Sequence, residues 1–465
     1  MGESLKSNPD WYLARVDRLP TWGLSYAIIW ALGFSFFITL YDVINVGFAL
    51  PYIPFVVSAS QASLIASLGL FGYVVGAPIF SYMADVIGRR PTLVFTALLT
   101  AIGSFGDAFS VNYPMLAIFR FLTGMAIGAD LVLVMTYMAE TAPASKRGRY
   151  TNLAFIGGWA GIGIGPFIAA LIVTSNTVIG WRIVFAVGGI LAVLALAIRY
   201  YAPETVRFLV SKSKFDDAER LVGRMEEVSL RRSGLASLPE PDMRSYRIPK
   251  QNPFKILVKP KYLKRLLALF FLLFFVYFMD YPFLVIPETW AKDVLGYSGS
   301  MLSQVVFLFG VAGVGAFLGS ILLRPFIDRY DRRKMTIVSV VVYTLGTGIM
   351  GYGGAVKSLA LFFVGAFLAE LIGVGWYQLY YQMCTDNFPT AARATGYAIA
   401  DGVGHLGGAI GLLVIFPIIY ALGNVGGWVI PWIPAIAMTL VVLALTPNTV
   451  GKRLEEINEA TDAVQ

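Results

Sequence analysis

Isolated charged side chains stand inside otherwise apolar stretches of this 465-residue sequence. If those stretches cross a bilayer, a charge near its centre costs about 2.5–3.5 kcal/mol, so each such group must be paired, hydrated or functional. A carboxylate beside a base, or beside the only histidine of the chain, can take up and release protons. The candidates for proton coupling are therefore Asp42, Arg120, Asp130, Asp280, Asp401 and His405.

A second set of side chains is suited to an organic ligand. Glu370, Tyr377 and Tyr381 recur at i, i+7 and i+11 along one helical stretch. Aromatic rings beside a carboxylate and an amide can stack on a small organic molecule and hydrogen-bond to it, although aromatic stripes are also common in plain helix packing. The candidate substrate-binding residues are Asn45, Arg120, Glu370, Trp376, Tyr377, Gln378 and Tyr381.

Two charged motifs occur twice in the chain, in the same order. An Asp-x-x-x-Arg-Arg motif begins at Asp85 and again at Asp328, and an acid-x-x-Pro-x-x-x-Arg motif begins at Glu140 and again at Asp386. Repetition at nearly the same offset indicates two homologous halves. Acids and bases on matching loops either form salt bridges that close one end of a helix bundle or make up a solvated charged surface. The candidate gating residues are Asp85, Arg89, Arg90, Glu140, Arg147, Glu204, Arg207, Asp328, Arg332, Arg333, Asp386 and Arg393.

The composition excludes a water-soluble enzyme. Apolar residues make up 57% of the chain, charged residues only 14%, and the mean hydropathy is +0.70, whereas a soluble domain carries about 25% charged residues. The single cysteine, Cys384, excludes an internal disulfide. The chain has no Gly-x-x-x-x-Gly-Lys-Ser/Thr loop for ATP and no Cys/His cluster, so we expect no cofactor and no metal.

The apolar stretches predict twelve spanning helices, because a helix needs about 20 apolar residues to cross a bilayer. The expected fold is an all-α membrane protein of two pseudo-symmetric six-helix bundles. Residues 1–201 form the first bundle, residues 202–262 a cytoplasmic linker with an amphipathic helix, and residues 263–465 the second bundle with a cytoplasmic tail. The predicted helices run over 22–50, 61–84, 91–110, 114–139, 150–174, 181–201, 263–287, 299–323, 334–354, 358–384, 394–420 and 428–446.

The distribution of Lys and Arg predicts the orientation of these helices. Basic residues concentrate in the loops on the side of the N-terminus, whereas the loops of the other side hold only Arg182, Lys292 and Lys357. Because cytoplasmic loops carry the excess of positive charge, we expect both termini in the cytoplasm and a multi-pass protein of the plasma membrane.

Two pairs of charged residues are expected to meet inside the membrane. Asp42 lies about eighteen residues into the first helix and Arg120 about six residues into the fourth, which places both in the outer half at compatible depth. We expect them to pair, either as a proton-coupling switch or as a permanent ion pair. Asp401 and His405 are four residues apart on one helix, where they either relay protons or leave His405 bonded within its bundle.

These motifs resemble those of the major facilitator superfamily over the whole chain. The segment from Asp85 to Arg90 resembles the loop signature after helix two, although Ser81 and Val86 depart from the usual Gly and Arg. Arg120-x-x-x-Gly124-x-x-x-Gly128 resembles the fourth-helix motif, and Gly161-x-x-x-Gly165-Pro166 resembles the fifth-helix motif. Pro203-Glu204-x-x-Arg207 resembles the segment after helix six of sugar porters. Tyr41-Asp42 resembles the first helix of aromatic-acid and metabolite proton symporters, although Thr39 replaces a second Asp.

The resemblance implies a secondary active transporter rather than an enzyme. It implies alternating access, proton symport and a small polar organic solute, such as an organic acid or another metabolite. A hexose is less favoured, because helix seven lacks the Gln-Gln-x-x-Gly motif of sugar porters. The alternatives are a polyspecific proton-antiport exporter and an uncoupled facilitator. The expected partners are the substrate, protons and the lipid bilayer, with no nucleic acid, and the expected state is a monomer.

Overall fold

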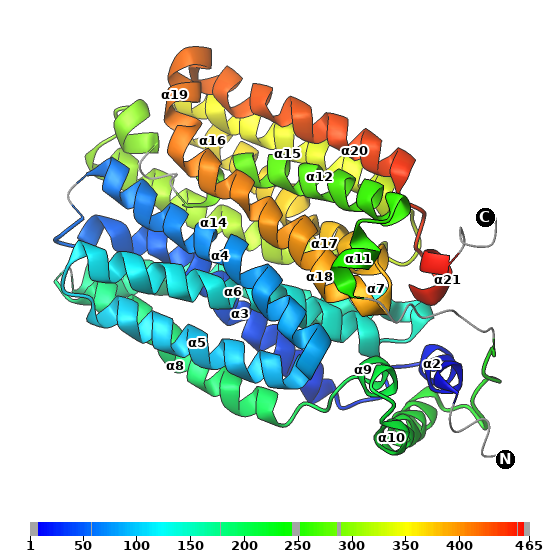
Figure 1. Ribbon diagram of the computed structural model, residues 1–465. Helices are drawn as coiled ribbons and strands as arrows, with labels where there is room; N and C mark the ends of the chain where they lie inside the picture. Colours follow the sequence, from blue (N-terminus) through cyan, green and yellow to red (C-terminus); the bar gives the residue numbers. More distant parts are fainter. Residues whose placement is uncertain are drawn as a thin grey trace.

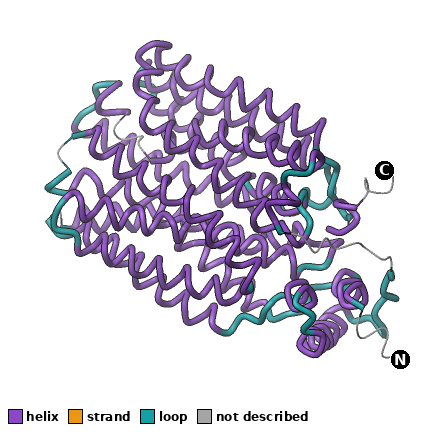
Figure 2. The backbone as a smooth tube through the Cα atoms, in the orientation of Figure 1, coloured by secondary structure: helices purple, strands orange, loops and turns teal. Residues whose placement is uncertain are grey.

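The computed structural model describes residues 8–56, 58–176, 178–243, 252–285, 290–452 and 454–459, and all regular structure within these ranges is helical (Figures 1 and 2). Eleven helices in these ranges are long and apolar enough to cross a membrane, and a shorter apolar helix covers Phe307–Leu323. Together they confirm the twelve predicted spans.

The first half contains six long helices. They are α3 (Tyr26–Ala49), α4 (Ala59–Ile87), α5 (Arg89–Phe109), α6 (Tyr113–Thr141), α7 (Arg147–Ser175) and α8 (Gly180–Tyr200). Helix α3 packs on α7, α4 on α6, and α5 on α8.

The second half begins with α12 (Pro260–Val285), α14 (Gly299–Leu323) and α15 (Arg332–Ala355). The tenth span is interrupted: α16 (Leu359–Leu368) is followed by a π-helical turn over Ala369–Gly373, a 3-10 turn over Val374–Trp376 and α17 (Gln378–Asp386). The eleventh begins with α18 (Arg393–Tyr397), passes through π and 3-10 turns over Ala398–His405 and continues as α19 (Leu406–Val429). Helix α19 bends at Gly423, where the φ angle is 76°. The last span follows this bend and ends in α20 (Ile433–Leu445).

The two halves meet along two related pairs of helices. Helix α7 of the first half packs on α14 of the second, and α4 packs on α19. These are the fifth helix against the eighth and the second against the eleventh, so the repeat seen in the sequence relates one pair to the other. The molecule is therefore built as two matching bundles with a shared central interface (Figure 1).

Short helices gather at one end of the bundles, which we call the linker end (Figure 1). They include α2 (Pro9–Asp17), α9 (Val206–Ser211), α10 (Phe215–Ser233), α11 (Pro253–Leu257) and α21 (Leu454–Glu459). Helix α10 lies in the segment where the amphipathic linker helix was predicted, and it buries Ala218, Val222 and Met225 beside α2. Residues 244–251 of the predicted linker lie outside the described residues.

Candidate transport site and gate

A cavity lies between the two halves. Its wall is rich in aromatic side chains and carries one carboxylate, Asp280. Among its lining residues there is no Lys or Arg, and the aromatic ones are Tyr73, Trp159, Tyr277, Tyr281, Tyr377 and Tyr381. Of the predicted ligand-binding residues, Tyr377 and Tyr381 therefore lie in the cavity wall. Aromatic rings with a few polar groups are the usual lining of a site for a small organic molecule.

A neighbouring cavity is lined by Arg120 and shares Val43, Tyr73 and Tyr281 with the first. On the side away from the linker end, the halves approach closely at Gly47 and Val285: a Cβ atom added to Gly47 would lie 2.6 Å from the backbone oxygen of Val285. The cavities are thus flanked by contacts between the halves.

Arg120 is shared between two buried acids. Its guanidinium pairs with Asp107 at 3.3 Å. The prediction of a direct pair between Arg120 and Asp42 is therefore wrong. Arg120 still interacts electrostatically with Asp42, whose carboxylate accepts a hydrogen bond from Ser104 at 2.9 Å. The physical reason for the difference is that Asp107 on α5 lies beside Arg120 and Thr123 on α6, and Thr123 also donates to it, at 3.2 Å. The cluster therefore holds one base against two acids.

Asp130 is held in a separate ion pair within the first half. Its carboxylate pairs with Arg199 of α8 and accepts a hydrogen bond from Thr96 at 2.7 Å. Arg199 also donates to Ser35 at 2.9 Å. These contacts join α3, α5, α6 and α8, and they give Asp130 a structural partner that the sequence reasoning did not identify.

The Asp401 carboxylate connects the two halves. It accepts hydrogen bonds from Tyr277 at 2.5 Å and from Tyr73 of the first half at 3.2 Å. His405 lies between the rings of these two tyrosines, with ring centroids 3.8 and 4.0 Å away. Its Nδ1–H donates to the backbone oxygen of Asp401 at 2.7 Å, so the expected contact runs to the main chain of Asp401 rather than to its carboxylate.

Other candidate residues lie away from the cavity wall. Asn45 is buried on the side of α3 that faces Gly165 of α7. Trp376 packs against the ends of α14 and α15. Gln378 donates at 2.8 Å to Thr151 of the first half, towards the linker end. Glu370 is fully buried in the π-helical turn of the tenth span and does not line the cavity.

Contacts between the halves close the linker end. Glu140, at the end of α6, accepts hydrogen bonds from Arg89 at 3.0 Å and from Arg393 of the other half at 3.2 Å. Asp85 pairs with Arg89 at 2.9 Å and accepts from the Thr395 hydroxyl of the other half, also at 2.9 Å. All of these side chains except Thr395 belong to the repeated motifs.

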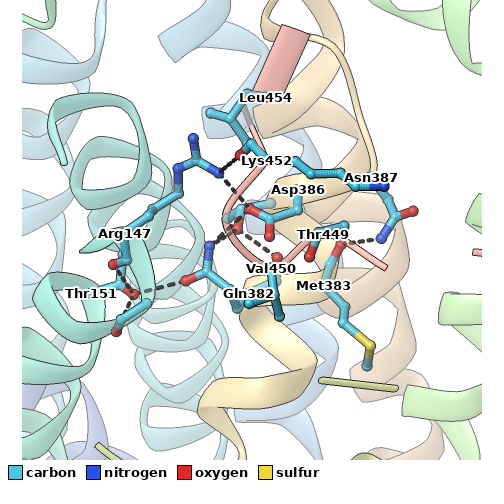
Figure 3. Close-up of polar contacts among 12 residues, drawn as sticks. Arg147, Thr151, Gln382, Met383, Asp386, Asn387, Thr449, Val450, Lys452 and Leu454 are labelled. Atoms are coloured by element: carbon cyan, nitrogen blue, oxygen red, sulfur yellow. Dashed lines mark hydrogen bonds and ion pairs between the residues drawn. The ribbon is translucent and has the colours of Figure 1, made fainter. Parts of the chain in front are cut away.

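The second half makes the reciprocal contacts, and Figure 3 shows the one between Arg147 and Asp386. Asp386 pairs with Arg332 at 2.9 Å and with Arg147 of the first half at 3.6 Å. Asp328 pairs with Arg332 at 3.0 Å and accepts from the backbone N–H of Arg149 at 2.9 Å. Each half therefore supplies an acid–arginine pair and an arginine that reaches the acid of the other half.

The remaining arginines of the motifs turn towards their own halves. Arg90 donates to the backbone oxygen of Tyr200 at 2.7 Å, and Arg333 donates to that of Thr446 at 2.5 Å. Each thus ties the start of one helix to the last span of its own bundle. Arg207 pairs with Asp17 at 3.0 Å and donates to the backbone oxygen of Glu140.

Glu204 and Glu226 are among the carboxylates outside the membrane-spanning segments whose pKa values are shifted. Burial raises the pKa of Glu204, although its carboxylate accepts backbone N–H groups of Thr205, Arg89 and Arg90 at the start of α5. Burial alone would also raise the pKa of Glu226 on α10, but hydrogen bonds from Arg15 and Arg18 outweigh it and hold that pKa below its usual value.

Residues 32–412 of the sequence match the family model described as Major Facilitator Superfamily. The chain belongs to the major facilitator superfamily. The niacin transporter NiaP of Acinetobacter baylyi is 25% identical over 456 residues, which cover 96% of this chain and 99% of that protein. The gallate transporter of Pseudomonas putida is 26% identical and covers 94% of each chain. The 4-hydroxybenzoate transporter PcaK of Acinetobacter baylyi is 27% identical over 76% of each.

The fold is also that of solved members of the superfamily. The proton:xylose symporter XylE, bound to 6-bromo-6-deoxy-D-glucose, superposes with a TM-score of 0.74 at 20% identity and covers 93% of this chain and 98% of XylE. The family match and the apolar spans together show that the chain is a multi-pass membrane transporter of the major facilitator superfamily.

In this major facilitator superfamily member, three residues near the candidate sites were missed by the sequence reasoning. Asp107 and Arg199 are charged residues near the ends of apolar stretches, and that position was a signal that could have identified them. Tyr73 gave no such signal, because a single tyrosine in an apolar helix is ordinary.

Proposed function

We propose that this protein is a proton-coupled symporter that moves a small polar organic solute by alternating access. The observation that supports it most is the position of the cavity, between two matching halves joined at one end by reciprocal ion pairs. Rocking of the halves would break those pairs and open the cavity to the linker end. The experiment that tests coupling itself is the last one described in the Discussion.

Asp42 is the group that we propose loads and releases the proton. Arg120 is shared between Asp107 and Asp42, and the direct ion pair goes to Asp107. One guanidinium cannot balance two carboxylates, so the charge balance of the cluster favours one bound proton. Among the described residues, Asp42 accepts a hydrogen bond from Ser104 and interacts with the more distant charge of Arg120, which makes it the freer of the two acids.

The linker end is proposed to face the cytoplasm, with both termini on that side of the plasma membrane. The basic loops and the ion pairs of Glu140 and Asp386 lie there, as the positive-inside rule requires. We also propose that the protein works as a monomer. We place the functional domains at residues 1–201, 202–262 and 263–465.

The proposed substrate is an organic acid or another metabolite small enough for an aromatic cavity. Three relatives that align with this chain over most of their length are named as transporters of niacin, gallate and 4-hydroxybenzoate. Each of these compounds has one aromatic ring. The rings of Tyr377, Tyr381 and Trp159 offer stacking partners for such a molecule.

A ligand-stabilisation screen tests this substrate class. Purified protein would be melted with niacin, gallate, 4-hydroxybenzoate, D-xylose, amino acids and phosphate, each at several concentrations. A ligand that binds only the folded state raises the Tm as its concentration rises. We expect an aromatic compound to stabilise the protein and Tyr377→Ala to remove the shift. Stabilisation by phosphate or amino acids alone would contradict the proposed class.

A further inference from the structure

Two carboxylic acids lie close together in the second half, remote from the Asp42 cluster. Asp280 is on α12 and lines the cavity, and Glu370 is in the π-helical turn Ala369–Gly373 of the tenth span. Their side chains are 2% and 0% exposed, and the two groups are near enough to interact electrostatically. A Cβ atom added to Gly315 of α14 would lie 3.3 Å from the Cβ atom of Glu370, so the tenth span packs closely on α14 at this point.

The titratable groups that face this acid pair are phenols. Tyr343 of α15 donates a hydrogen bond to Asp280 and interacts electrostatically with both acids. Tyr377 lies beside Asp280 on the side of the tenth span, and Tyr281 follows it on α12. Among the described residues, no Arg, Lys or His pairs with either acid or acts on its charge. No basic side chain of the described residues therefore balances the negative charge that the two acids would carry.

The two acids differ in what supports a negative charge. Asp280 has the hydroxyl of Tyr343, whereas neither carboxylate oxygen of Glu370 has a hydrogen-bond partner in the described part of the chain. By contrast, the buried acids Asp107 and Asp130 of the first half each pair with an arginine. A buried carboxylate with neither a base nor a donor is destabilised by several kcal/mol, and such a group takes up a proton instead.

We infer that Glu370 holds a proton at neutral pH and that Asp280 and Glu370 together form a second proton-binding site in the second half, with Asp280 on the cavity wall and Glu370 buried beside it. Glu370 keeps the proton because Asp280 takes the hydrogen bond of Tyr343. The tenth span is irregular at this point, where a π-helical turn is followed by a 3-10 turn, and such interruptions are frequent at functional sites. A change in the path of this helix would alter the separation of the two acids and hence their hold on the proton.

This inference rests on the proposed function only in assigning the proton to coupling; the protonation of Glu370 is independent of any substrate. It is tested by infrared spectroscopy of the purified full-length protein at pH 7, with the side-chain carboxyls of glutamate labelled with ¹³C. The label shifts the carbonyl stretch of protonated glutamic acid and leaves that of aspartic acid in place. We expect one such labelled band in the wild type, its loss in Glu370→Gln, and its retention in the exposed control Glu227→Gln.

The absence of a labelled protonated band in the wild type would overturn the inference without any need for a variant. A band that persisted in Glu370→Gln would assign the proton to another glutamate, and it would overturn the inference as well. Asp280→Asn adds a check on the pair: the band should remain but move, because the neighbour of the protonated group has changed, and an unmoved band would show that the two acids do not interact. None of these results depends on transport, so a failure here is distinguishable from a failure of coupling at Asp42.

Discussion

The guanidinium of Arg393 lies 3.2 Å from the carboxylate of Glu140, although the two residues belong to opposite halves of the molecule. Arg147 reaches Asp386 in the same way at 3.6 Å. Because the four residues occupy matching positions in the repeat, each half carries both an acid and the arginine that pairs with the acid of the other half. The contact between the halves is therefore made twice at the linker end.

Removal of one of these contacts should favour opening at the linker end. In Glu140→Gln the charge that pairs with Arg393 is lost, and a hydrogen bond to a charged group contributes about 1.5–3 kcal/mol. We expect the ratio of open to closed molecules to rise roughly tenfold or more. The measurement is the distance between spin labels at two exposed positions, Arg220 of the linker helix α10, which packs on α2 of the first half, and Tyr330 of the second half. Cys384 is buried.

The matched control for this variant is Asp331→Asn. Asp331 pairs with Arg333 of the same half, so its loss removes an acid–arginine contact at the linker end without touching the contact between the halves. The label distance should stay unchanged in this control. An equal increase in both variants would mean that general loosening, and not the Arg393–Glu140 contact, sets the distance.

Opening at the other end should follow from a methyl group at Gly47. The added Cβ atom of Gly47→Ala would lie 2.6 Å from the backbone oxygen of Val285, so α3 and α12 must separate. Spin labels at Val111 and Leu422, which are exposed at that end, should move apart. In the control Gly163→Ala the nearest atom is 3.4 Å away, an ordinary contact, and no change is expected. Unchanged distances in Gly47→Ala would refute the close approach.

The attachment of α2 to α10 should depend on pH through Glu226. This carboxylate pairs with Arg15 at 2.6 Å and with Arg18 at 2.5 Å, and its pKa lies below the usual value. An acid with a lowered pKa stabilises the folded state above its unfolded pKa of about 4.3, and that contribution is lost as the pH falls through the lower native value. The protection of the α2 amides, which is exchange corrected for its intrinsic rate at each pH, should therefore stay constant from pH 7 to about pH 5 and fall at pH values below about 4.3.

The variant Glu226→Gln should speed exchange in α2 at pH 7, by roughly tenfold or more, because charged hydrogen bonds of about 2 kcal/mol are lost. Glu227→Gln is the matched neighbour: it pairs only with Arg231 on an exposed surface and should leave α2 unaffected. Fast exchange of α2 in the wild type at pH 7 would contradict this role for Glu226.

The sequence predicted the spans and the salt bridges of the repeated motifs better than the partners inside the membrane. Apolar spans and repeated motifs can be recognised from local sequence alone, and the structure contains the predicted spans and the contacts of the motifs. Partners depend on how helices rotate against each other. Asp42 and Arg120 were matched by depth alone, and Asp107 on the intervening helix α5 took the direct ion pair.

The stripe through Glu370, Tyr377 and Tyr381 shows the same limit. It assumed a continuous α-helix, but π-helical and 3-10 turns between Ala369 and Trp376 change the number of residues per turn. Tyr377 and Tyr381 therefore face the cavity while Glu370 does not, and Trp376 packs towards the ends of α14 and α15. A sequence pattern with period 3.6 cannot anticipate such interruptions.

Coupling at Asp42 is tested most directly by accumulation in proteoliposomes with an imposed inward proton gradient. The solute is the compound that stabilises the protein in the ligand screen, and exchange of labelled for unlabelled solute without a gradient reports whether the carrier still moves. The wild type should concentrate the solute above its external level. Asp42→Asn should fail to concentrate it yet retain measurable exchange; uphill accumulation equal to that of the wild type would remove Asp42 from the proton path.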